Sequence, residues 1–240
     1  MPDIAITIIL FLLLIAELVT VPLFIKVGWP KRSTKSTVLK CLSSLFFILT
    51  AVFTCQLSGG FSPVAVLMIA GFILSLIGDF CLDQILTDRN ILFGIIFFFS
   101  AHLFYLFAFI QSSKRMDAPK AFTLWEILSI AAIIVVAAVG SKLIKMDMRK
   151  LFLPVALYAC VISTMFVKAL TTGILALGNP AYGLKAALPL WIGAGLFITS
   201  DIILSFMYFG NKNTKNMRTW NLITYFSGQM LLAYSLISFA

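Results

Sequence analysis

Long runs of apolar residues, broken by short polar links, dominate the chain. Each run has about the 20 residues that a helix needs to cross the hydrocarbon core of a membrane, or more. The links are rich in glycine, proline and charged residues, and all are too short for a soluble domain. The pattern therefore predicts eight membrane-spanning helices, over residues 4–27, 38–57, 63–86, 91–110, 122–144, 151–175, 187–209 and 219–239.

Composition supports this interpretation. Hydrophobic residues make up 61% of the chain and charged residues 11%, whereas a soluble domain carries roughly 25% charged residues. The first apolar run is too long for a signal-peptide core and lacks a small-residue cleavage site after it, so we expect it to be retained as a span. The expected fold is an all-α, polytopic transmembrane bundle of eight helices in a single domain over residues 1–240.

A weak internal repeat relates the third and seventh predicted helices. A glycine, an aspartate and a leucine recur at a constant offset, first as Gly71, Asp79 and Leu82 and then as Gly193, Asp201 and Leu204. These two helices would run in the same direction, four spans apart. A parallel duplication of two four-helix halves would produce this relation, and it would bring both aspartates to a similar depth.

The net charge of +9 comes from basic clusters in the links rather than from one basic surface, which favours membrane topology over nucleic-acid binding. Most of these basic residues lie in the links that lead from an odd-numbered predicted helix to the next even-numbered one: Lys31, Arg32 and Lys35, then Lys142, Lys145, Arg149 and Lys150, then Lys212, Lys215 and Arg218. The opposite side holds Lys114, Arg115, Lys120 and Lys185. The positive-inside rule therefore predicts a multi-pass integral membrane protein with both termini outside the cytoplasm.

Two intramembrane aspartates, Asp79 and Asp201, are the strongest candidates for chemistry. A charged group at membrane depth costs roughly 2.5 to 3.5 kcal/mol on insertion scales, so such residues normally face an interior cavity. Two carboxyl groups in one cavity do not both ionise freely, which leaves one neutral acid and one anionic base. Other polar candidates on neighbouring helices are Lys40, Ser75, His102, Tyr105, Ser200, Asn221, Tyr225 and Gln229.

Structural roles compete with this interpretation. Asp79 and Asp201 could instead pair with Lys40 or His102 and only hold helices together, and Tyr225 and Gln229 could be interhelical contacts. Glu17 and Lys168 are interpreted as mainly structural. Four scattered cysteines are interpreted as small core residues, and the single histidine has no ligand cluster in sequence, so no metal site is expected.

The same positions carry a resemblance to a known family, the lysoplasmalogenases or YhhN-like membrane proteins. The similar segments are Lys40-Cys41-Leu42, Gly71 with Ser75 and Gly78-Asp79, His102 with Tyr105, Pro154 with Tyr158, Gly193 with Ser200-Asp201, and Thr224-Tyr225 with Gln229. They occur in order over nearly the whole chain. Ser43 and Phe226 depart from the proline and tyrosine that relatives often carry, and both bear on the shape of the pocket.

The resemblance implies hydrolysis of the vinyl-ether bond of a lysophospholipid by Asp79 and Asp201, without metal or organic cofactor. The products would be a fatty aldehyde and glycerophosphocholine or glycerophosphoethanolamine. Tyr158 joins the expected substrate contacts, and Lys40 is expected to hold the lipid phosphate at the cytoplasmic entrance. One alternative is a proton-coupled transporter that uses the same carboxyl groups. An intramembrane aspartyl protease is less favoured, because Leu76 precedes Ile77-Gly78-Asp79 where its Gly-x-Gly-Asp signature needs glycine.

Overall fold

The computed structural model of the chain describes residues 2–31, 33–83, 87–118, 120–210 and 212–239. Within these ranges the structure is all-helical, and eight helices are long and apolar enough to span a membrane. The transmembrane fold expected from the sequence is therefore confirmed. The helices are α1 (Pro2–Val27), α2 (Thr34–Leu57), α3 (Pro63–Asp83), α4 (Asp88–Arg115), α5 (Leu124–Leu143), α6 (Phe152–Gly178), α7 (Gly183–Phe209) and α8 (Lys215–Phe239).

Most helices extend beyond the apolar runs that predicted them, and at α2 and α4 a polar cap begins the extra turn. At the start of α2, the Ser33 and Ser36 side chains accept hydrogen bonds from each other's backbone N–H groups. The Thr87 hydroxyl likewise accepts from the Asn90 N–H at the start of α4. The third predicted span ran to residue 86, whereas α3 ends at Asp83 and residues 84–86 lie outside the described ranges.

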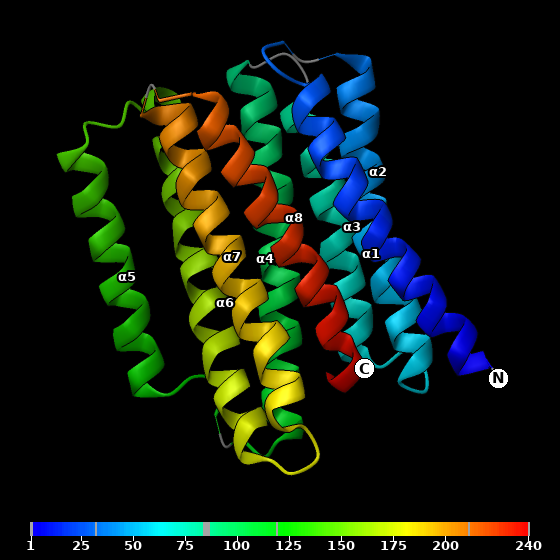
Figure 1. Cartoon of the computed structure of the whole chain (residues 1–240). Helices are drawn as coiled ribbons and strands as arrows, with labels where there is room; N and C mark the ends of the chain where they lie inside the picture. The colour runs from blue at the N-terminus through cyan, green and yellow to red at the C-terminus, as the bar shows by residue number, and fades with distance from the viewer. Residues whose placement is uncertain (1, 32, 84–86, 119, 211, 240) are drawn as a thin grey trace.

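The helices are arranged around α8, which lies in the middle of the bundle and packs on α7, α2, α1 and α3 (Figure 1). Helices α1 and α2 form one flank, and α5 stands at the opposite edge, where it packs mainly on α6. The described ends of the chain lie at the same end of the bundle, as an even number of crossings requires. The central position of α8 places its polar side chains beside both α3 and α7.

A buried ion pair attaches the start of α5 to α6. The Lys168 Nζ lies 3.0 Å from Glu126 Oε1, and the Thr171 hydroxyl donates to the same oxygen at 2.5 Å. These contacts agree with a structural role for Lys168. Glu17 is buried on α1, where its carboxyl group lies beside Ser43 of α2.

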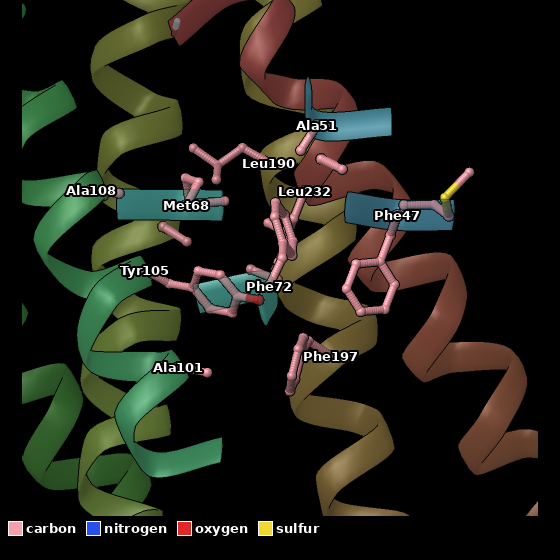
Figure 2. Packing of buried hydrophobic residues seen from close by; sticks show 14 of the residues in the cluster. Phe47, Ala51, Met68, Phe72, Ala101, Tyr105, Ala108, Leu190, Phe197 and Leu232 are labelled. Atoms are coloured by element: carbon pink, nitrogen blue, oxygen red, sulfur yellow. The ribbon is translucent and has the colours of Figure 1, made fainter. Parts of the chain in front are cut away.

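Within the buried core, an aromatic cluster joins α3, α4 and α7 (Figure 2). The ring of Phe72 lies 5.3 Å from that of Tyr105, which lies 6.4 Å from that of Phe197. Gly71 makes this packing possible, because a Cβ there would overlap the Tyr105 ring. All three rings are fully buried, so the cluster fixes the distance between the helices that carry the candidate site.

The four cysteines are free, and they do not all belong to the core as the sequence suggested. Cys55 is buried, whereas Cys160 is exposed on the side of α6. Its thiol is apolar enough to face lipid, so hydropathy alone could not separate the two positions.

Candidate active site

A cavity of about 420 Å³ brings the two aspartates together between α1, α2, α3, α4, α7 and α8. It opens at the end of the bundle where the α1–α2 and α7–α8 links lie, and Trp29, Lys31 and Asn213 line that opening. This is the basic end, which the positive-inside rule assigns to the cytoplasm. Both Asp79 and Asp201 line its wall, as the sequence predicted from their matching depth.

Asp79 on α3 is surrounded by donors. The Lys40 Nζ lies 3.1 Å from Asp79 Oδ1, and it also donates to the Asp79 backbone carbonyl at 3.2 Å. Oδ2 accepts hydrogen bonds from the Ser44 hydroxyl at 2.7 Å and the Tyr225 hydroxyl at 2.6 Å. An ammonium group and two hydroxyl donors are the partners that stabilise a carboxylate, so Asp79 has three groups that support a negative charge.

Asp201 on α7 has different neighbours. The Tyr158 hydroxyl donates to Asp201 Oδ2 at 2.5 Å, and the His102 Nε2 lies 3.9 Å from the same oxygen. No Lys or Arg side chain in the described part of the chain pairs with this carboxyl group. Its side chain is 13% exposed, compared with 3% for Asp79. Asp201 is therefore the carboxyl group that is more open to the cavity and less supported as an anion.

His102 is oriented by α4 itself. Its Nδ1 lies 2.6 Å from the Phe98 carbonyl oxygen. A carbonyl can only accept, so Nδ1 carries the proton and the Nε2 of a neutral ring is an acceptor. Nε2 is fully buried and has no hydrogen-bond partner among the described residues. A neutral ring in this orientation therefore gives the Asp201 carboxyl group an acceptor rather than a cationic partner, 3.9 Å away.

The two aspartates are held in related ways. Asp79 is contacted from α2, the helix before its own, and from α8, the last helix of the other half. Asp201 is contacted from α6, the helix before its own, and from α4, the last helix of the first half. This is the arrangement that a duplicated four-helix unit would give, and the duplication itself stays a prediction.

A chain of hydrogen bonds lies behind Tyr225. The Gln229 amide donates to the Tyr225 hydroxyl at 3.3 Å, and its oxygen accepts from the Tyr105 hydroxyl at 3.2 Å. Tyr105 in turn shares a hydrogen bond with Ser75 at 3.1 Å. The chain fixes the position of the Tyr225 hydroxyl, and through it that of the Asp79 carboxylate.

The structure separates the predicted substrate contacts into two groups. Those that line the cavity with the aspartates are Lys40, Ser200 and Tyr225. The others do not line it. Tyr158 and His102 lie directly against Asp201. Gln229, Tyr105 and Ser75 reach Asp79 only through Tyr225. Their role in substrate binding stays a prediction, and their contacts favour positioning of Asp79 and Asp201.

Three further residues gain a role from the structure. Ser44 donates to Asp79, and its place one helical turn after Lys40 is the signal that could have identified it. The Asn221 amide donates to the Ser200 carbonyl and hydroxyl, at 2.8 and 2.9 Å.

Arg218 lines the mouth of the cavity, lies 4.0 Å from Asp83 and packs over the Phe24 ring. The sequence showed Arg218 only as one member of a basic cluster.

Comparison with known proteins covers most of the chain. The model of the YhhN family matches residues 35–236, a range that begins at α2 and includes both aspartates. No curated protein and no solved structure matches the chain.

Proposed function

The chain belongs to the YhhN family of lysoplasmalogenase-like proteins, and we propose that it hydrolyses the vinyl-ether bond of lysoplasmalogens. Membership of this family suggests that the protein is a membrane hydrolase. The observation that supports this reaction is a pair of carboxyl groups in one cavity, one with an ammonium partner and one without. Cleavage of a vinyl ether needs one proton donor and one anion.

The first step is protonation of carbon. Asp201, as the neutral acid, gives its proton to the alkenyl carbon distal to the ether oxygen. The carbon–carbon π electrons form the new C–H bond, which leaves an oxocarbenium ion on the proximal carbon and the ether oxygen. The Asp79 carboxylate stabilises this cation by its charge, and Lys40, Ser44 and Tyr225 hold that carboxylate in place.

Water then adds to the cation. Asp79 takes a proton from the attacking water, whose oxygen bonds to the proximal carbon to form a hemiacetal. The Asp201 carboxylate accepts the hemiacetal hydroxyl proton, and the bond to the glycerol oxygen breaks as that oxygen takes the proton from Asp79. The products are a fatty aldehyde and the glycerophospho alcohol. Both carboxyl groups return to their starting forms.

The basic side chains at the mouth of the cavity support the proposal that the substrate is a phospholipid. Lys31 and Arg218 line the opening, above the aspartates. Guanidinium and ammonium groups are the usual partners of phosphate, so we assign them to the headgroup. This role differs from the expectation that Lys40 holds the phosphate, because Lys40 lies 3.1 Å from Asp79, whereas Lys31 and Arg218 lie at the mouth, where Arg218 is 4.0 Å from Asp83.

Substitution of each aspartate tests the proposal. Asp79→Asn and Asp201→Asn should each lower aldehyde release from lysoplasmenyl lipid by about 10²–10⁴-fold, the usual contribution of general acid–base groups. Asp147→Asn, which lies outside the cavity lining, is the matched control and should keep activity. Full turnover in either aspartate variant would refute the mechanism. An intact lipid that is only moved across the membrane would favour the transporter.

Isotope labelling tests which bond of the substrate is broken. In heavy water the aldehyde should gain one deuterium on the carbon next to the carbonyl, because that carbon receives the catalytic proton. In oxygen-18 water the glycerophospho product should stay unlabelled, because water attacks the alkenyl carbon. Label in the glycerol product would mean attack on the other side of the ether and would eliminate this mechanism.

A further inference from the structure

A second, apolar hollow lies on the lipid-facing side of α1 and α8. This groove has a volume of about 830 Å³, and it is lined by α1, α2 and α8. Several lining side chains are strongly exposed, among them Phe11 at 62% and Tyr234 at 46%. In a membrane these surfaces meet hydrocarbon, so a lipid chain can enter the groove from the side. Helix α1 precedes the segment matched by the family model.

The groove and the catalytic cavity are neighbours along the α1–α8 seam. A smaller hollow of about 280 Å³ lies between them. Trp29 lines both the cavity and this hollow, and Pro22 and Ile223 line both this hollow and the groove. On the inner side, Phe24 of the cavity meets Phe226 of the groove edge-to-face, with ring centroids 6.5 Å apart. The three hollows therefore adjoin one another along the seam, with the Phe24 and Phe226 rings in contact between the cavity and the groove.

The order of chemistry along α8 matches the order of groups along a lysolipid. Arg218 lies at the mouth, and Tyr225, about 10 Å further along the helix, holds Asp79. The groove extends from Ile223 to Ile237, about 21 Å of helix. In a lysolipid the phosphate, the ether bond and the single hydrocarbon chain follow in the same order.

The cavity suits a hydrocarbon chain less well than the groove does. Its wall carries Lys40, both aspartates, Ser200 and Asn221, and a chain placed there would remove water from these polar groups without replacing their hydrogen bonds. The groove offers apolar contacts instead. Glu17 lines it, but its carboxyl oxygens are fully buried and present no polar surface to a chain.

We propose that the groove between α1 and α8 holds the alkenyl chain of the substrate and sets the chain-length preference. The inference rests on the proposed function for the identity of the substrate. The occupant is one hydrocarbon chain of a lysophospholipid whose headgroup lies at the mouth and whose ether bond lies at Asp79 and Asp201.

A photoreactive analogue tests the site without turnover. The probe is a lysophospholipid with a saturated ether, which has no double bond to protonate, and a diazirine at the end of its chain. Bound to the full chain in bilayer discs, it should label groove residues on α1 and α8, such as Leu10, Tyr234 and Ile237. Labelling confined to α5, α6 or α7, or a crosslinked dimer that covers the groove, would overturn the proposal.

Filling the groove gives a second measurement. Ser227 lines it with a small, exposed side chain, so Ser227→Trp should cut labelling about tenfold, the effect of a 1.4 kcal/mol clash. It should lower kcat/KM about tenfold for a long-chain substrate and spare a short-chain analogue that ends before Ser227. Ala137→Trp on the exposed face of α5 is the matched control. Equal losses for both chain lengths would refute a chain-length role.

A variant with a wider groove provides the test if the Ser227→Trp variant does not fold. Tyr234→Ala removes bulk from the distal end of the groove and should shift the preferred substrate to longer chains; an unchanged preference would count against the groove. The two proposals fail separately. Groove labelling without aldehyde from any vinyl-ether lipid would remove the proposed hydrolysis and keep the lysolipid site, whereas hydrolysis without groove labelling would remove only the chain site.

Discussion

Replacement of Lys40 by methionine separates two roles for this residue. As a phosphate anchor, the role expected from its position in the sequence, Lys40 would mainly affect KM. The structure pairs it with Asp79 at 3.1 Å, with side chains only 9% and 3% exposed. Removal of one partner of a buried ion pair costs about 3 to 5 kcal/mol, because the other charge is left uncompensated. We therefore expect Lys40→Met to act on the Asp79 carboxylate.

The size of the effect follows from that penalty. If protonation of Asp79 removes the whole penalty, the fraction of Asp79 present as the carboxylate falls by roughly two to four powers of ten, because each factor of ten corresponds to 1.36 kcal/mol. The value of kcat should fall by up to this factor, because Asp79 can no longer accept a proton from water. KM should change little. Methionine keeps most of the length of the lysine stem, so the change isolates the charge.

Steady-state aldehyde release, measured over a range of lipid concentrations, gives kcat and KM separately. Lys31→Met at the mouth is the matched control and should mainly raise KM. Thermal unfolding adds a readout, since Lys40→Met should lose stability that Asp79→Asn in the same chain restores, as expected for coupled partners. A raised KM with unchanged kcat would refute this reasoning and return Lys40 to the phosphate.

Other positions give independent tests. Tyr158→Phe removes the donor to Asp201 at 2.5 Å and should lower kcat about tenfold, the value of one hydrogen bond of about 1.4 kcal/mol; an unchanged kcat would remove Tyr158 from the site. Gly71→Ala places a Cβ against Tyr105 and should destabilise the fold by about 1 to 3 kcal/mol, whereas Gly140→Ala meets open space and should be nearly neutral in thermal unfolding. A thiol label at Lys212→Cys, in a cysteine-free background, should react only from the cytoplasm, and a tag after the last residue should be reached only from the other side; the reverse result would invert the topology.

Hydropathy and the cost of charge in hydrocarbon determined most of the fold from the sequence alone. Each apolar run must satisfy its backbone hydrogen bonds internally, so a run of this length becomes a helix whatever surrounds it. The same cost identified Asp79 and Asp201, because a carboxyl group at that depth needs an interior cavity. Both side chains line one cavity, as that argument expects, and their role in catalysis stays a proposal.

Which polar side chains pair with each other was decided only by the packing of helices that lie far apart in the sequence. Lys40 could have faced a phosphate or a carboxylate, and the position of α2 against α3 gives it Asp79. Gln229 and Tyr105 have polar ends that could reach a substrate, but their crossing helices turn them toward each other behind Tyr225. Periodicity gives the face of a helix on which a side chain lies. Which neighbour meets that face depends on how the helices pack, and here that packing distinguishes the two aspartates.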